Sequence, residues 1–117
     1  MVSQTILIVD DDQIMVELLA IWLRDAGFAV LTAIDETTAV AALESVAAVA
    51  AVVCDFELGQ STGCSVLAKL SKLQPSLVII MISGHSEHIV RTKCQFSEGH
   101  FLQKPFAPAD LVALIVA

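Results

Sequence analysis

The chain has 117 residues, which is enough for one domain and too few for two. Hydrophobic residues make up 56% of the chain and charged residues only 16%, a composition that favours a packed core and argues against disorder. The net charge of −7 argues against nucleic-acid binding, and the longest apolar run, residues 46–54, is shorter than the roughly 20 residues of a membrane-spanning helix.

Strand-like and helix-like segments alternate along the whole chain. In chain order we predict a strand over residues 5–10, a helix over 13–26, a strand over 28–33, a helix over 36–47 and a strand over 50–55. A polar loop with two glycines over 57–63 precedes a helix over 65–73, a strand over 77–82, a helix over 87–95, a strand over 101–103 and a helix over 108–116. Strict β-α order predicts a five-stranded parallel sheet with helices on both faces.

Charged residues follow three of these strands at the points where the strands end. Asp10 and Asp11 follow the first strand, Asp55 ends the third, and Lys104 follows the fifth. Because ligands of open parallel sheets bind at the carboxyl ends of the strands, we expect these side chains to converge on one site. Clustered carboxylates repel one another, and a divalent oxygen-seeking cation together with a lysine would supply the balancing charge.

This set of residues has the chemistry needed for phosphoryl transfer. A bound magnesium ion would reduce the repulsion among carboxylates and orient an incoming phosphoryl group. An aspartate beside the metal can then act as nucleophile and form an acyl phosphate. Lys104 and the hydroxyl of Ser83 can bind the negatively charged oxygens of the transferring group.

The pattern of residues 6–11, then Asp55, Ser83 and 104–106, resembles the receiver domain of bacterial two-component response regulators. The resemblance covers essentially the whole chain, so residues 1–117 are expected to form one response regulatory domain. It implies a flavodoxin-like (βα)5 fold, which is a doubly wound five-stranded parallel sheet in a three-layer sandwich. It also implies Mg²⁺-dependent phosphotransfer to one aspartate from a histidine kinase or a histidine phosphotransfer protein.

The resemblance assigns the acidic residues to phosphoacceptor and metal-binding roles. Asp55 matches the phosphoacceptor, Asp11 the direct metal ligand and Asp10 its water-mediated neighbour. The backbone carbonyl of Glu57 matches a further metal ligand. Gly59 stands where the family often has proline.

The remaining matches concern the switch and its support. Ser83 matches the switch hydroxyl, Phe101 the aromatic switch residue, and Lys104 the lysine that binds the phosphoryl group. The bond from Lys104 to Pro105 is expected to be cis, and Gly63 matches the glycine that opens the third helix.

The leading functional hypothesis is a phosphorylation-controlled signalling switch that acts through protein contacts, without turnover of a separate substrate. Its expected partners are the phosphodonor and a downstream output protein or domain, with no nucleic acid or membrane contact by this domain. Both a stand-alone receiver and a piece of a larger regulator or hybrid kinase fit the sequence. The apolar run over residues 111–116 at the end of the chain slightly favours the larger protein.

Two other hypotheses remain open at this point. Asp10 and Asp12 after an apolar strand, followed by Ser83 and Lys104, imitate the order of a small phosphohydrolase of the haloacid-dehalogenase type. That hypothesis leaves Asp55 without a role and lacks a downstream acidic pair for the metal. The other is a degenerate receiver that binds its partners without being phosphorylated.

The three cysteines, Cys54, Cys64 and Cys94, are odd in number and irregularly spaced, which is not typical of a disulfide framework or a zinc site. We expect structural or neutral roles for all three. Reduced thiols suit the cytoplasm, and no signal peptide precedes the first strand, so we predict a cytoplasmic protein.

The first helix has more apolar residues than one core-facing stripe needs. Met15, Leu18, Leu19 and Trp22 are predicted to face the core, which leaves Ile14 and Ile21 on other faces. Together with the apolar last helix and the low charge content, this surplus predicts weak formation of a homodimer through the first and last helices.

Overall fold

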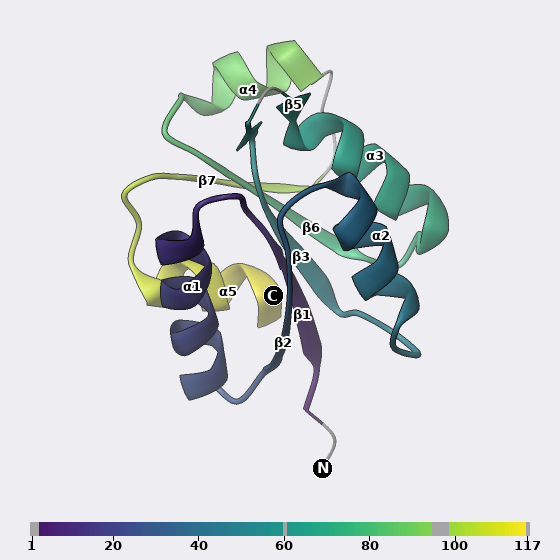
Figure 1. The fold of residues 1–117 in the computed structure, drawn as a ribbon. Helices are drawn as coiled ribbons and strands as arrows, with labels where there is room; N and C mark the ends of the chain where they lie inside the picture. Colours follow the sequence, from purple (N-terminus) through teal and green to yellow (C-terminus); the bar gives the residue numbers. More distant parts are fainter. Residues whose placement is uncertain (1–2, 60, 95–98, 117) are drawn as a thin grey trace.

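Five parallel strands form the central sheet of the protein in the computed structural model, which describes residues 3–59, 61–94 and 99–116 (Figure 1). The strand order is β2-β1-β3-β6-β7, so the first strand, β1, has β2 on one side and β3, β6 and β7 in succession on the other. The bounds are β1 (Thr5–Val9), β2 (Ala29–Ala33), β3 (Ala51–Asp55), β6 (Val78–Ser83) and β7 (His100–Gln103).

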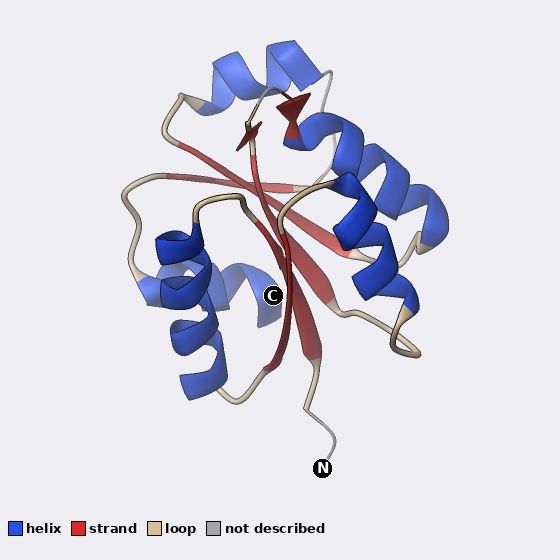
Figure 2. Cartoon of the chain, viewed as in Figure 1, coloured by secondary structure: helices blue, strands red, loops and turns tan. Residues whose placement is uncertain are grey.

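Helices cover both faces of this sheet (Figure 2). The helices α1 (Gln13–Asp25) and α5 (Pro108–Val116) lie on one face. On the other face lie α2 (Glu36–Glu44), α3 (Gly63–Leu73) and α4 (Glu87–Cys94). This arrangement confirms the predicted flavodoxin-like (βα)5 three-layer sandwich.

Alternate residues of each central strand pack into one of two apolar clusters, because successive side chains of a strand point to opposite faces. Ile8, Val53 and Ile80 pack under α1 and α5, whereas Leu7 and Val52 pack under the other three helices. Every residue of β3 is buried, as the continuous apolar character of this segment predicts for a central parallel strand.

The helix α1 begins at Gln13, as predicted, but its buried face is rotated relative to the prediction. Asp12 accepts hydrogen bonds from the backbone N–H groups of the first turn, and Gly27 adopts a φ of 97° after the last turn. Leu18 was predicted to face the core but is 39% exposed. The buried positions are instead Val16, Leu19, Ala20 and Leu23, with Met15 and Trp22 partly buried beside them.

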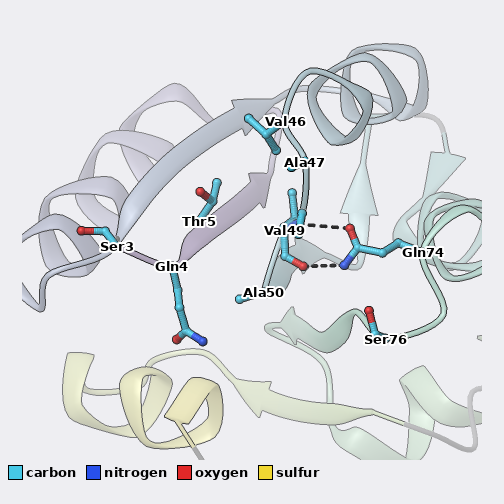
Figure 3. A pocket seen from close by; sticks show the side chains of 10 residues that line it. Ser3, Gln4, Thr5, Val46, Ala47, Val49, Ala50, Gln74 and Ser76 are labelled. Atoms are coloured by element: carbon cyan, nitrogen blue, oxygen red, sulfur yellow. Dashed lines mark hydrogen bonds between the residues drawn. The ribbon is translucent and has the colours of Figure 1, made fainter. Parts of the chain in front are cut away.

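The second helix ends at Glu44, three residues before its predicted end, although alanine favours helix there. Ser45 closes the last turn by donating from both its N–H and its hydroxyl to the carbonyl of Ala42. The chain then turns toward β3, where the side-chain amide of Gln74 binds both backbone groups of the buried Val49, at 3.2 Å and 2.5 Å (Figure 3). Tertiary hydrogen bonding therefore outweighs helix propensity in this segment.

The predicted polar loop over residues 57–63 contains a short antiparallel hairpin that the sequence analysis missed. Its strands are β4 (Glu57–Leu58) and β5 (Ser61–Thr62), and Gly59 lies between them with a φ of 60°. The third helix consequently begins at Gly63, two residues before its predicted start.

Gly63 brings the first turn of α3 directly against the end of β3. Its N–H donates to the carbonyl of Phe56 at 2.7 Å. A β-carbon at this position would lie 2.4 Å from the backbone oxygen of Asp55 and 2.9 Å from Sγ of Cys54. Only glycine fits here without moving the backbone that carries Asp55.

We therefore expect Gly63→Ala to lower the free energy of unfolding by about 2 kcal/mol, because the added methyl group overpacks a site walled by backbone. Gly84→Ala is the matched control, because a β-carbon there meets no atom within 4 Å and should change stability little. Urea denaturation of the two variants measures the difference. Equal stabilities would contradict the close approach of α3 to β3.

Candidate functional site

Three carboxylates from two adjacent strands meet at the carboxyl edge of the sheet. Val9 pairs with Cys54 in the β1–β3 ladder, so Asp10 and Asp55, which follow them, lie side by side. Carboxylate oxygens of Asp10, Asp11 and Asp55 all lie within 4.8 Å of one another. Strand register thus brings together residues that are far apart in the sequence.

Asp10 is the deepest of the three carboxylates and is completely buried. Its Oδ1 accepts a hydrogen bond from the N–H of Asp12 at 2.9 Å, whereas Oδ2 has no hydrogen-bond partner among the described residues. Burial raises the pKa of Asp10 to about 6, and the charge of Asp55 contributes to this rise. A buried carboxylate oxygen without a partner is costly unless a cation or a proton compensates it.

Asp55 is only 7% exposed and lies between a backbone donor and a cation. Its Oδ1 accepts a hydrogen bond from the N–H of Glu57 at 3.3 Å, and its Oδ2 lies 3.5 Å from Nζ of Lys104. Burial raises the pKa of Asp55 even though the Lys104 ammonium lowers it. Of the two oxygens, Oδ2 faces the positive charge of Lys104.

The donor set fits a divalent, oxygen-seeking cation. Three carboxylates supply oxygen ligands. Oδ2 of Asp10 accepts no hydrogen bond from the described residues, so a cation bound there would compensate its negative charge. A β-carbon on Gly59 would lie 3.6 Å from Oδ2 of Asp11, so the β4–β5 turn borders the cluster on its exposed side.

The far side of the site is built by the last two strands of the sheet. Ser83 is buried at the end of β6, and its hydroxyl accepts a hydrogen bond from the N–H of His85 at 3.0 Å. The N–H of Lys104 donates to the carbonyl of Ser83 at 2.8 Å, and the Lys104–Pro105 bond is cis. Phe101 of β7 is half-buried and packs against the cluster beneath α2, α3 and α4.

One ion pair at the site was not predicted. Nε2 of His85 lies 2.7 Å from Oε1 of Glu57, and the His85 ring meets Phe56 edge-on at 6.1 Å between centroids. Each member of the pair stands two positions beyond a strand-end residue, Asp55 for Glu57 and Ser83 for His85. The register argument that placed the aspartates together could have found this pair.

The comparisons with known proteins agree with this geometry. Residues 6–116 match the family model for the response regulator receiver domain. The chain belongs to this family. A putative NtrX-like response regulator from Rickettsia conorii is 34% identical over 113 residues, which are 94% of this chain and 24% of the relative.

Two solved receiver structures resemble the chain over nearly its full length. The receiver protein from Sinorhizobium medicae is 30% identical, with a TM-score of 0.85, 97% of this chain covered and 92% of the other. The receiver domain of NtrX from Brucella abortus is 32% identical, with a TM-score of 0.82 and 92% of both chains covered. Family membership gives the protein a phosphoacceptor role in two-component signalling.

The receiver spans less than half the length of the curated relatives it matches. Within the part of the chain that the structure describes, no helix combines the length and apolar character needed to cross a membrane.

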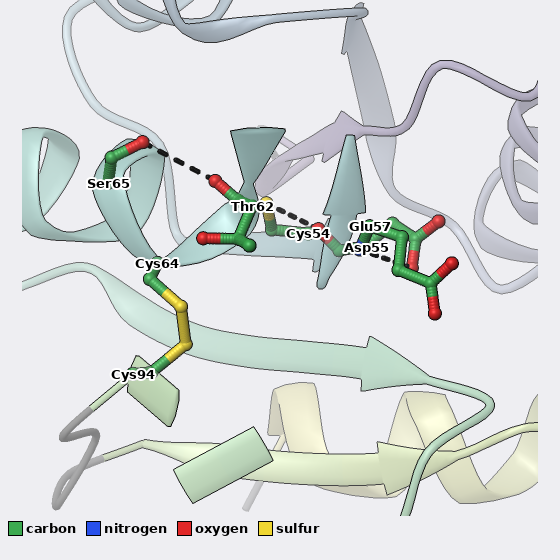
Figure 4. Close-up of a disulfide and its surroundings, with 7 residues drawn as sticks. All are labelled: Cys54, Asp55, Glu57, Thr62, Cys64, Ser65 and Cys94. Carbon is green, nitrogen blue, oxygen red and sulfur yellow. Dashed lines mark hydrogen bonds between the residues drawn. A yellow bond between two sulfur atoms is a disulfide. The ribbon is translucent and has the colours of Figure 1, made fainter. Parts of the chain in front are cut away.

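The expectation that all three cysteines are reduced and outside any disulfide was wrong for two of them. Cys64 in the first turn of α3 and Cys94 at the end of α4 form a disulfide, with their Cα atoms 5.3 Å apart (Figure 4). Neither spacing nor count revealed it, because the pairing depends on how α3 and α4 pack. Cys54 is a free, buried core residue, as predicted.

The raised pKa of Asp10 leads to a pH-dependent stability in metal-free solution. Because the folded pKa of about 6 exceeds the ordinary 3.8, the folded state binds more protons over this interval, and stability falls as pH rises through it. We expect Asp10→Asn to stabilise the receiver at pH 7 in chelator by about 2 kcal/mol, and much less at pH 4.

Thermal and urea unfolding at the two pH values measure this effect. Asp25→Asn is the control, because it changes the net charge equally at an exposed position at the end of α1. If both variants shift stability alike at pH 7, the buried orphan carboxylate is not the cause.

Proposed function

We propose that Asp55 is the phosphoacceptor of this receiver and takes its phosphoryl group from a histidine kinase or a histidine phosphotransfer protein. The observation that carries the proposal is the position of Asp55 inside the carboxylate cluster with Oδ2 facing Lys104. Asp10 is more deeply buried, and Asp11 has no cation placed against it by a described ion pair. Asp55 thus combines a small solvent exposure, which Asp10 lacks, with an adjacent positive charge, which no described ion pair gives to Asp11.

In the proposed step a carboxylate oxygen of Asp55 attacks the phosphorus of the donor in line with the leaving atom. The new O–P bond forms as the bond from phosphorus to the donor nitrogen breaks, giving an acyl phosphate and a free imidazole on the donor. Nζ of Lys104 pairs with one phosphoryl oxygen, and the hydroxyl of Ser83 donates to another. The protein turns over no separate substrate.

Asp10, Asp11 and Asp55, with the backbone carbonyl of Glu57, would hold a Mg²⁺ ion at this edge of the sheet. The ion would supply charge neutralisation for the carboxylates and orientation for the phosphoryl group. The orphan Oδ2 of Asp10 and the mutual approach of the three carboxylates support this assignment.

Ser83 and Phe101 are the proposed switch residues. Ser83 would exchange its present bond from the N–H of His85 for a bond to the phosphoryl group. Phe101 already packs partly against the core, so we expect its inward state to be populated before phosphorylation. The proposed support comes from Gly63 beneath Asp55 and from cis-Pro105 beside Lys104.

We assign residues 1–117 to a single receiver domain that acts in the cytoplasm on a downstream output protein or output domain. The greater length of its curated relatives supports an attached output region. The acidic net charge supports the absence of nucleic-acid contact by this domain, and we propose no membrane contact for it.

The phosphohydrolase alternative depends on Asp12 as a catalytic residue. In the structure Oδ1 of Asp12 accepts hydrogen bonds from the N–H groups of Ile14 and Met15, so it caps α1. Asp55, to which that alternative assigns no role, lies in the carboxylate cluster. Both observations favour the receiver function.

Phosphorylation by a small acyl phosphate tests the proposal. We expect Mg²⁺-dependent incorporation that is abolished by chelator and by Asp55→Asn, and retained by Asp25→Asn. Lys104→Ala should retain part of the incorporation but lose the conformational response, because the ammonium is proposed to hold the charged group. Peptide mapping of the phosphoaspartate locates the acceptor, and modification of Asp10 would overturn the assignment. A chain that gains no phosphate from any such donor would instead be a degenerate receiver.

We also propose weak homodimerisation through α1 and α5, supported by exposed apolar side chains on both helices. Ile14 is 79% exposed, Ile21 54% and Val116 65%. We expect Ile14→Gln to weaken self-association several-fold, whereas Ile89→Gln on the opposite face should not. Sedimentation velocity over a wide concentration range measures this, and a strict monomer would exclude the dimer.

A further inference from the structure

The Cys64–Cys94 disulfide (Figure 4) joins α3 and α4, which lie on the same face of the sheet (Figure 1). Cys64 is the second residue of α3 and Cys94 is the last residue of α4. Both are half-buried and pack against the apolar cluster beneath these helices. Both residues are thus less buried than Cys54, which is completely buried.

The helix α4 buries little apolar surface against the rest of the protein. Its fully buried residue is Val90, whereas α3 buries Val66, Leu67 and Leu70. The Arg91 side chain adds a contact to the carbonyl of Gly99 at 3.5 Å. A helix with so little buried apolar surface opens at low free-energy cost once a cross-link is removed.

The segment that leads into α4 is connected to the proposed phosphorylation site. The N–H of His85 binds the hydroxyl of Ser83, and the His85 ring binds Glu57. At the start of α3, which carries Cys64, the N–H of Gly63 donates to the carbonyl of Phe56, the residue that follows Asp55. The disulfide thus completes a chain of contacts that runs from Asp55 through α3 and α4 to Ser83.

We propose that Cys64 and Cys94 form a reversible redox switch that controls how far α4 can move. In the oxidised form the disulfide holds α4 against α3 and restricts its movement when Ser83 responds to phosphorylation. In the reduced form α4 is released at its end and follows Ser83 more fully. This coupling rests on the proposed function of Asp55 and Ser83.

The cellular context that we propose favours a reversible role over a purely structural one. Disulfides of cytoplasmic proteins are usually transient and serve catalysis or redox sensing. Burial raises the pKa of the Cys54 thiol, so the third cysteine does not compete for the disulfide. The chain therefore has one exchangeable pair of cysteines among its described residues, with a buried thiol as an internal reference.

The proposed reaction is thiol–disulfide exchange with a cellular thiol such as glutathione. A glutathione thiolate attacks one protein sulfur, the S–S bond breaks, and the other protein sulfur leaves as a thiolate that takes up a proton. A second glutathione thiolate attacks the mixed disulfide and releases the remaining protein thiolate. Two glutathione molecules are thereby oxidised to one glutathione disulfide, and both cysteines become thiols.

Equilibration with mixtures of reduced and oxidised glutathione tests reversibility in the full chain. After acid quench and alkylation under denaturing conditions, peptide mapping gives the redox state of each cysteine. We expect Cys64 and Cys94 to open together within the excess of reduced glutathione typical of cytosol, with Cys54 alkylated throughout. A pair that stays closed at all such ratios is a structural disulfide, and that result would overturn the switch.

Hydrogen exchange of the unphosphorylated chain tests control of α4. Reduction of the wild type should speed exchange of the amides of α4 by about tenfold or more, with the strands of the sheet unchanged. Cys64→Ser and Cys94→Ser should each reproduce the reduced pattern and lose all response to reductant. Equal protection of α4 in both redox states would overturn the proposal.

The coupling to phosphorylation is measured by repeating the exchange with a small acyl phosphate and Mg²⁺. The change in α4 protection on phosphorylation should be larger in the reduced chain than in the oxidised chain, and equal changes would overturn the coupling. Failure of Asp55 to gain phosphate would instead overturn the proposed function, since control of α4 is decided in the unphosphorylated chain.

Discussion

The burial of two carboxylates at the sheet edge is the constraint on which the rest of the site depends. Asp10 and Asp55 are held beside each other by the register of β1 and β3, and neither can move away without breaking a buried strand ladder. Burial raises the pKa of both groups, so the folded state holds an electrostatic cost that a cation can relieve. Lys104 relieves part of it from the opposite side.

Each element around the cluster can be understood as a way to hold these charges in place. Gly63 allows α3 to begin directly beneath Asp55, with no room for a side chain. The N–H of Lys104 binds the carbonyl of Ser83, so the lysine and the hydroxyl approach the cluster from one locally bonded unit. A phosphoryl group arriving at Asp55 would add negative charge that this unit is placed to receive. Charge balance and conformational response are therefore properties of the same contacts.

The sequence was sufficient to predict the sheet, the order of its layers and the convergence of Asp10, Asp11, Asp55 and Lys104. These features depend on the hydrophobic periodicity, the positions of the strand ends and the parallel arrangement of the strands. All three can be read from local sequence patterns, and together they define one architecture. The buried face of α1 was misplaced because several stripes of that helix are apolar, so periodicity alone did not decide among them.

Other features were out of reach because they depend on contacts between elements. The early end of α2 reflects the bonding of Val49 by Gln74, 25 residues away, which no helix propensity encodes. The β4–β5 hairpin has strands of only two residues, too short for an alternating pattern to show. The pairing of Cys64 with Cys94 depends on the packing of α3 and α4.

The helix α4 has one attachment that could be predicted from the sequence and one that could not. Its first end is fixed by Ser83 and His85, whose positions follow from the strand order. Its last end is fixed by a covalent bond that strand order does not imply. Because α4 buries little apolar surface of its own, these two attachments contribute to holding it in place. A helix held in this way can respond to a change at either end, so the two proposed signals, phosphorylation at Asp55 and oxidation at Cys64 and Cys94, would act on the same helix.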